Sequence, residues 1–390
     1  MTGSAKAGRI QTVDALRGFA LFGILLVNIE VFANPFYAMG LPNPDFAGPV
    51  AQGTSWLVTA LFETKFYLIF SFLFGYSLTL QMAAAERDDQ PFRPRFLRRQ
   101  VMLFCLGVFH ALALFHGDIL TTYAVLGLAL YALRHRNDKS LLCIAAGLIF
   151  FVTLIWFLIL LAQIYLLPQV PEALVLQHVR QAQAAFTGGV SSLLNQRLSE
   201  LSNLWIVLGF MQGPCALAMF LLGLIAGRRR VLADITALQP LLRRIILIGV
   251  LVGLPGGIFY GWTAIQPYDP VRDLVAVVVD LATAPFLAAA YIAGMALLLN
   301  AAADRGWVAM LATAGRMALS NYLFQSLLCA LLFHAYGLRL MGQVSPPLVV
   351  ALAMGIFALQ LVLSRFWLSR FRNGPVEYLL RYVTYGGSRS

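Results

Sequence analysis

Apolar residues in this chain are gathered into long runs that are separated by short polar segments. An α-helix needs roughly 20 apolar residues to cross the hydrocarbon core of a bilayer, and the runs have about this length. The pattern therefore predicts an all-α, polytopic membrane protein, with residues 1–390 forming a single transmembrane domain. We expect about ten spans, at residues 13–33, 55–82, 97–115, 118–134, 140–167, 204–227, 243–264, 273–300, 308–335 and 347–368.

The positive charges between these runs predict the orientation of the helices. When the loops are assigned alternately to the two sides, twenty-one Lys and Arg residues fall on one side and four on the other. Cytoplasmic loops carry the excess of Lys and Arg, so both termini are predicted to be cytoplasmic. A signal peptide cleaved near Ala33 is the alternative for the first run, but the polar residues inside that run favour a retained span.

Composition supports the same class of protein. Hydrophobic residues make up 60% of the chain and charged residues 12%, whereas soluble domains average roughly 45–50% and 25%. These values exclude a soluble enzyme and a disordered regulator. The net charge of +11 could suggest nucleic-acid binding, but the basic residues lie in short loops, so we expect a lipid bilayer and no nucleic acid as partner.

Two segments outside the spans are predicted to lie along the membrane surface. The loop 168–203 mixes apolar residues with Gln, Arg and Ser, which is typical of periplasmic amphipathic helices that Gly188 and Gly189 would interrupt. Residues 372–390 are predicted to form a cytoplasmic interfacial segment.

The four cysteines stand one per apolar run without metal-ligand spacing, so no metal is expected.

Polar residues inside the first span are candidates for a ligand site, because ionisable groups in a membrane are costly and usually functional. Asp14 and Arg17 are three residues apart and can pair on one helix face. Asn28 follows Arg17 by eleven residues, which returns to nearly the same face about 16 Å further along the helix. The alternative is that Asp14 and Arg17 only anchor the span.

Lys65 lies in the second span and is a candidate counter-charge for an anionic ligand. A lysine at this depth needs a carboxylate or a hydrated cavity. The alternative is that Lys65 extends outward to the interface beside Glu63.

The third and fourth spans meet in a tight hairpin that contains His116, Gly117 and Asp118. A histidine close to an aspartate is typical of an oriented general base, because the carboxylate fixes the tautomer of the imidazole. We therefore expect His116 to be the base and Asp118 to orient it. The alternative is that Asp118 only caps the fourth span. His110 has no carboxylate nearby in sequence and is interpreted as structural.

The ninth span contains Arg316, Asn321 and Gln325. Arg316 requires an anion, which Asp14 or a ligand phosphate could supply. Asn321 and Gln325 are four residues apart and face one neighbour, either a ligand or an adjacent helix. Asp280 in the eighth span is a further acid without a predicted partner.

Five motifs occur in order along the chain: Asp14-Ala-Leu-Arg17-Gly18 with Asn28; Lys65-Phe with Phe70-Ser71 and Phe74-Gly75; His116-Gly117-Asp118; Gly315-Arg316-Met-Ala-Leu-Ser-Asn321-Tyr; and Gly374-Pro375-Val-Glu377. Together they resemble the YeiB family of bacterial inner-membrane proteins. That family is similar in fold to transmembrane acyltransferases, among them heparan-α-glucosaminide N-acetyltransferase and the acyltransferase-three proteins.

The resemblance implies transfer of an acyl group from cytoplasmic acyl-CoA to a sugar or lipid acceptor at the periplasmic side. Asn28 matches an active-site asparagine of the N-acetyltransferase. The chain departs from the pattern at the catalytic histidine, because position 28 holds Asn, and Met39 stands near where the N-acetyltransferase has its histidine. His116 or His110 would have to substitute.

Two classes of function remain open at this point. In an acyltransferase, Arg17 and Arg316 would bind phosphates of the co-substrate acyl-CoA, Asn28 would stabilise the oxyanion, and His116 with Asp118 would deprotonate the acceptor. In a transporter of a small anionic or lipid-like metabolite, the same residues would form a binding site without chemistry. A structural or regulatory membrane protein is a third alternative.

No tightly bound cofactor is expected, and a homodimer is one alternative for the oligomeric state.

Overall fold

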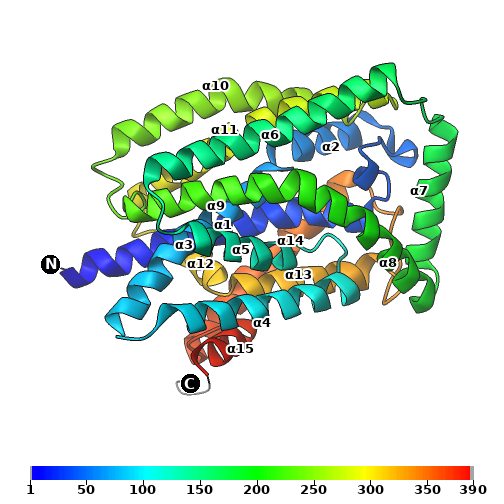
Figure 1. The fold of residues 1–390 in the computed structure, drawn as a ribbon. Coiled ribbons are helices and arrows are strands. Elements are labelled where there is room, and N and C mark those ends of the chain that lie inside the picture. Colours follow the sequence, from blue (N-terminus) through cyan, green and yellow to red (C-terminus); the bar gives the residue numbers. More distant parts are fainter. Residues whose placement is uncertain (1, 387–390) are drawn as a thin grey trace.

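The computed structural model describes residues 2–386, and over this range the protein is built from helices without β-strands (Figure 1). The α-helices are α1 (Thr2–Ala33), α2 (Pro49–Leu61), α3 (Lys65–Arg87), α4 (Phe92–Ala113), α5 (Leu120–Leu133), α6 (Asp138–Tyr165), α7 (Glu172–Thr187), α8 (Val190–Val207), α9 (Gly213–Arg228), α10 (Gln239–Thr263), α11 (Pro270–Ala301), α12 (Gly306–Arg316), α13 (Ala318–Phe333), α14 (Pro346–Arg370) and α15 (Pro375–Tyr385). Shorter elements are the 3₁₀ turns η1 (Tyr37–Met39) and η2 (Pro44–Phe46) and the π-helix η3 (Leu208–Gln212).

The helices confirm a polytopic helical membrane protein. Eight helical segments in the described chain are long and apolar enough to cross a bilayer, or nine if the bent pair α12 and α13 forms one span. The difference from the ten predicted spans is α5, which has 14 residues. Such a helix is about 21 Å long, which is shorter than a hydrocarbon core of about 30 Å.

Two of the predicted spans are interrupted by turns. The run 55–82 divides into α2 and α3, and Thr64 between them adopts a left-handed backbone with φ of 63°. The run 308–335 divides into α12 and α13, which meet at an angle of 80°. Non-helical backbone at membrane depth is tolerated where protein covers it or where it lines a cavity. Both breaks border the cavities described below.

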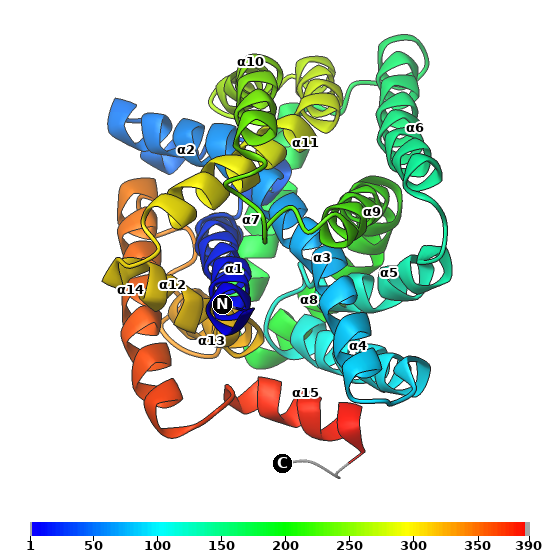
Figure 2. The ribbon, with the colours of Figure 1, turned by 90° about the vertical axis from the view of Figure 1, so that its left-hand side faces the viewer.

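The segment 168–203 forms α7 and most of α8, and the two helices are divided at the predicted glycines Gly188 and Gly189. Figure 1 shows α7 lying across one end of the helix bundle. The helix α15 lies toward the end of the bundle away from α7, where Figure 2 shows it beneath α4 and α13. Residues 387–390 of the predicted segment 372–390 lie outside the described residues.

Small residues allow the central helix α1 to pack closely on its neighbours. A Cβ atom at Gly18 would clash with the backbone of Leu311, and one at Gly315 would clash with the backbone of Asp14. Close backbone approach of this kind replaces the hydrophobic effect as the source of helix association in lipid. The motif Gly315-Arg316 is therefore held directly against the motif Asp14…Arg17.

Turns rich in arginine gather at one end of the bundle. The N-terminus, the α3–α4 turn and the α9–α10 turn lie at the left of Figure 1, whereas α7 lies at the right. We call the end with the arginine-rich turns the basic end, and we call the end that α7 crosses the opposite end. Arg228 and Arg229 at the end of α9 both bond to Asp138, at 3.1 and 2.9 Å, which ties α9 to the start of α6.

The arrangement makes a prediction about topology. Reporter fusions after Asp138, Arg230 and Arg305 should all report a cytoplasmic location, because these positions lie at the start of α6, just after α9 and just before α12, beside the arginine-rich turns. A fusion at Gly188, between α7 and α8, should report a periplasmic location. A reproducible reversal at any one of these positions would contradict the orientation.

Candidate functional site

Five arginine side chains line a cavity of about 440 Å³ at the basic end, which we call the arginine cavity. They come from four different helices and are Arg17, Arg95, Arg99, Arg316 and Arg381. Arg17 and Arg316 are the two that the sequence predicts as ligand contacts, whereas the pattern of basic loops accounts for the other three only as charges that set topology. The helices α4 and α15 bring those three back over the bundle, so the cavity carries a concentrated positive charge.

A second cavity of about 660 Å³ lies at the opposite end, and we call it the carboxylate cavity. Its acids are Glu63 and Asp273, and its other polar groups include Asn28, Asn34 and His116. Aromatic side chains form much of its wall; they are Phe46, Phe62, Phe66, Tyr67, Tyr37, Phe115, Trp156, Tyr260, Tyr268 and Tyr322. Such a lining suits a ligand that presents both apolar faces and hydrogen-bonding groups.

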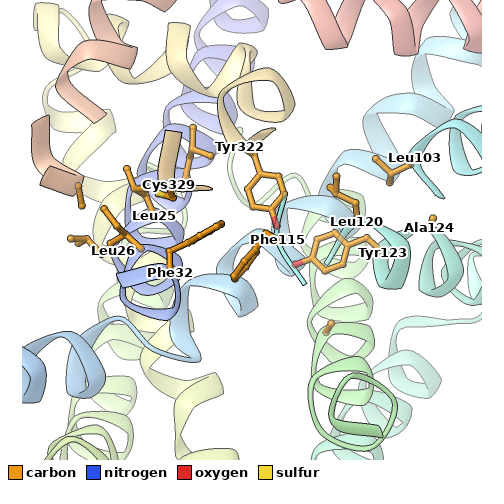
Figure 3. Packing of buried hydrophobic residues seen from close by; sticks show 14 of the residues in the cluster. Leu25, Leu26, Phe32, Leu103, Phe115, Leu120, Tyr123, Ala124, Tyr322 and Cys329 are labelled. Carbon is orange, nitrogen blue, oxygen red and sulfur yellow. The ribbon is translucent and has the colours of Figure 1, made fainter. Parts of the chain in front are cut away.

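The two cavities meet at a thin layer of side chains that we call the junction. Ile24, Ile119 and Tyr322 line both cavities. Figure 3 shows Tyr322 near Phe115 and Tyr123 in this part of the core. The Tyr322 hydroxyl is buried and has no side-chain hydrogen-bond partner among the described residues. It is therefore the one polar group among the three junction side chains.

Arg17 and Asp14 form the ion pair that their spacing predicts. Arg17 Nη1 donates to Asp14 Oδ1 at 2.7 Å, and Arg17 Nη2 donates to Ser77 Oγ at 2.6 Å. Asp14 is nearly buried and is not part of the cavity lining. It therefore positions Arg17 rather than facing the cavity itself, and a direct contact between Asp14 and a ligand stays a prediction.

The other arginines are less fully engaged. Arg316 Nη2 donates to the carbonyl oxygen of Arg372 at 3.1 Å. Arg95 lies 3.5 Å from Asp88, and its guanidinium stands over the ring of Tyr385. The Nε atom of Arg99 is buried without a hydrogen-bond partner among the described residues. These groups retain donors for an anionic ligand.

Lys65 lines neither cavity, and a carboxylate of the chain, one of the two partners that its depth requires, compensates its charge. Lys65 Nζ donates to Asp280 Oδ1 at 2.7 Å, and both side chains are buried, with 0% and 3% exposure. Thr64 Oγ1 donates to the other carboxylate oxygen of Asp280 at 2.7 Å. Both charges can be buried because each one compensates the desolvation cost of the other. Asp280, for which the sequence predicts no partner, is thus the counter-charge of Lys65.

The hairpin between α4 and α5 also differs from its predicted arrangement. Asp118 Oδ1 lies 2.8 Å from Nδ1 of His110, not of His116, and Asp118 Oδ2 accepts from the backbone and side chain of Thr121. His110 Nε2 lies 2.8 Å from Ser326 Oγ. The prediction that Asp118 orients His116 is therefore wrong. Asp118 caps α5 and holds His110, which is completely buried away from both cavities.

His116 lines the carboxylate cavity and stacks on Phe186. Its Nδ1 atom is buried and has no hydrogen-bond partner among the described residues. Burial, together with the nearby Arg197 guanidinium, lowers the pKa of His116 to about 4. The imidazole is thus neutral at pH 7 and presents a hydrogen-bond acceptor or donor according to its tautomer.

Asn321 and Gln325 hold helices together and are not placed to bind a ligand. Asn321 Nδ2 donates to Ser364 Oγ at 2.9 Å, and Gln325 Nε2 donates to Gln360 Oε1 at 2.7 Å. All four groups are buried between α13 and α14, outside both cavities. Of the predicted site residues, Arg17 and Arg316 reach one cavity, and Asn28 and His116 reach the other.

Acid should destabilise the protein through the histidines beside Arg197. Burial, followed by the Arg197 charge, lowers the pKa of His334 as well as that of His116. The folded state therefore binds fewer protons than the unfolded chain between pH 6.5 and about 4, and stability should fall as pH decreases through this window. His116→Gln should flatten that fall in a melting-temperature series in detergent. His135→Gln, at an exposed position, is the control, and an unchanged slope in His116→Gln would contradict the prediction.

Comparison with known proteins places the chain in a family. Residues 226–387 match the family described as "Protein of unknown function (DUF418)". The uncharacterized protein YxaH of Bacillus subtilis (strain 168) is 31% identical, over 97% of this chain and 94% of the relative. The uncharacterized protein YeiB of Escherichia coli (strain K12) is 28% identical, over 96% of each chain. Because this similarity extends over nearly the whole length, the chain belongs to the YeiB family of membrane proteins.

Proposed function

We propose that the protein is a membrane-bound acyltransferase that moves an acyl group from acyl-CoA in the arginine cavity to an acceptor in the carboxylate cavity. The observation that carries this proposal is that the two cavities lie at opposite ends of the bundle and share Ile24, Ile119 and Tyr322. A donor and an acceptor that enter from opposite sides can meet only where such cavities touch. The junction is therefore the proposed site of reaction.

The donor side matches a phosphate-bearing ligand with an apolar arm. Arginine presents several donors in a planar fork that suits phosphate oxygens, and it remains charged at any physiological pH. Deeper in the arginine cavity the lining becomes apolar, with Leu21, Phe70 and Phe74. Acyl-CoA has this distribution of charge, because its phosphates lie at one end and its thioester lies at the end of a long arm.

The acceptor side matches a sugar or a lipid headgroup. Carboxylate and amide groups such as Glu63, Asn28 and Asn34 bind hydroxyl groups, while Trp156 and Tyr260 offer aromatic faces. Glu63 is itself held by the hydroxyls of Tyr37 at 2.7 Å and Tyr260 at 3.0 Å. This support fixes the position of its carboxylate in the wall of the cavity.

The proposed reaction is the attack of an acceptor hydroxyl on the thioester carbonyl. The new C–O bond forms as the C–S bond breaks, and the hydroxyl proton is passed to the departing sulfur. The Tyr322 hydroxyl and the Asn28 amide are the donors available for the oxyanion that develops. The Nδ1 atom of His116 accepts the hydrogen bond of the attacking hydroxyl. Because the lowered pKa makes this imidazole a weak base, its rate enhancement lies at the lower end of the range for general-base catalysis.

A transporter is the second candidate, and the same junction favours it. Two cavities separated by a single layer of side chains are also the form expected for alternating access to one anionic ligand. The two functions differ in their product, since a transferase cleaves the thioester and a transporter does not. Release of free CoA from a purified, vesicle-reconstituted protein would separate them.

Binding of the donor should depend on the arginine cavity. Arg316→Ala should weaken binding of radiolabelled acetyl-CoA to the purified protein by about 10–100-fold, because a hydrogen bond to a charged group contributes roughly 1.5–3 kcal/mol. Arg316→Lys should recover part of the loss, since the charge remains but the planar fork does not. Arg305→Ala is the matched control, because Arg305 is exposed at the same end and does not line the cavity. Equal affinity in all three variants would remove Arg316 from the donor site.

Turnover should depend on the hydroxyl of Tyr322. Tyr322→Phe should lower the rate of acyl transfer by about 10²–10³-fold, the usual effect of removing one oxyanion donor. Acetyl-CoA binding should change little, because the aromatic ring and its packing on His110 are kept. Tyr291→Phe is the control, since the Tyr291 hydroxyl donates to the carbonyl oxygen of Leu61 away from both cavities. A Tyr322→Phe enzyme with parental turnover would contradict the role of the junction.

A further inference from the structure

Glu30 is a buried acid that neither the fold nor the proposed reaction explains. It lies on α1, two residues after Asn28, and only 1% of its surface is exposed. Neither of its carboxylate oxygens has a hydrogen-bond partner among the described residues. An isolated buried carboxylate costs several kcal/mol or more, so this side chain requires a compensating group.

The neighbouring charges do not compensate Glu30 and make its position less favourable. Glu63 is close enough to repel it electrostatically. Glu63 already receives the hydroxyl groups of Tyr37 and Tyr260, and its nearest cation, Lys65, is bonded to Asp280. Among the described residues this region therefore contains three carboxylates and one ammonium group, which leaves two carboxylates without a counter-charge. The hydroxyls of Tyr37 and Tyr260 stabilise one of them, Glu63, and Glu30 is left without any donor.

The carboxylate cavity supplies a route by which a cation could reach this region. Glu63 lines that cavity, and Tyr37, whose hydroxyl donates to Glu63, is joined to Glu30 through the backbone hydrogen bonds of Asn34. Thr59 on α2 also lines it, and the Thr59 hydroxyl is buried without a partner among the described residues. Carboxylate and hydroxyl oxygens are the ligands that hard cations prefer. Acidic residues inside membranes commonly mark proton and ion pathways.

We propose that Glu30 and Glu63 form a binding site for one small monovalent cation, either a proton or an alkali-metal ion, that enters from the carboxylate cavity. The size of the cation follows from burial, because Glu30 is not part of the cavity lining and a substrate ammonium group could not reach it. The single charge follows from the ligands, because Glu63 is already held by the hydroxyls of Tyr37 and Tyr260, and only Glu30 has neither a hydrogen-bond donor nor a counter-charge among the described residues. The site is independent of the acyl-transfer proposal, since it requires only the resting protein.

Infrared spectroscopy of the purified protein tests the proton directly. A protonated carboxylic acid has a C=O stretching band that is separate from the bands of ionised carboxylates. If the cation is a proton, the parent protein should show this band and Glu30→Gln should lose it. Glu172→Gln, which removes an exposed carboxylate, should leave the band unchanged.

A stability titration tests the alkali-metal ion. If the cation is Na⁺ or K⁺, the band should be absent at high salt, and the parent's melting temperature should rise with the salt concentration at constant ionic strength, with choline as the balancing ion. Glu30→Gln should abolish that rise, whereas Glu30→Asp should keep part of it because a carboxylate remains. Glu30→Asp also serves if Glu30→Gln does not fold.

Two results would overturn the proposal. One is a parent protein that has neither the carboxylic-acid band nor a specific response to Na⁺ or K⁺. The other is a band or a salt response that persists unchanged in Glu30→Gln. Failure of acyl transfer in the same preparation would not affect either readout, because both are measured without donor or acceptor.

Discussion

A charge inside a membrane protein must be compensated by groups close to it, and this constraint determines how the central helices are joined. Lys65 and Asp280 are both almost inaccessible to solvent and lie 2.7 Å apart. Removing either one would leave an unpaired charge in a low-dielectric interior, which usually costs about 3–5 kcal/mol. The pair therefore fixes the start of α3 against α11. That contact positions the α2–α3 break, and with it Glu63, at the wall of the carboxylate cavity.

The same constraint explains which features the sequence could predict. Local patterns were sufficient for the helical class, most of the spans, the division of α7 from α8 and the Asp14–Arg17 pair, because each depends on residues a few positions apart. The ends of helices were harder. A run of apolar residues does not reveal that Thr64 adopts a left-handed backbone or that α12 and α13 meet at 80°. These breaks depend on groups that stabilise them from distant parts of the chain, such as Glu377, whose carboxylate accepts from the backbone of Leu319 at the start of α13.

Partners in the candidate site were predictable only where they were close in sequence and on one helix. Asp118 lies two residues from His116, yet the hairpin turns its carboxylate toward His110, eight residues away. The separation between Lys65 and Asp280 is 215 residues, so no spacing rule could have paired them. Arg99 was interpreted as a charge that sets topology, because a basic cluster beside an apolar run marks the cytoplasmic side in most membrane proteins. Only the packing of α4 and α15 shows that this guanidinium also faces a cavity.

The opposite charges of the two cavities impose a direction on any ligand that spans the junction. In the proposed acyl transfer, an anionic headgroup would be favoured among the arginines and disfavoured beside Glu63, so the donor would be held with its uncharged end toward Tyr322. Under that proposal, charge would oppose passage of the whole donor while its apolar arm reached the junction. A cation near Glu30 and Glu63 would reduce the repulsion on the far side. When that site is occupied, the carboxylate cavity would therefore repel an anionic ligand less strongly, and the junction would discriminate less between an anionic ligand and a neutral one.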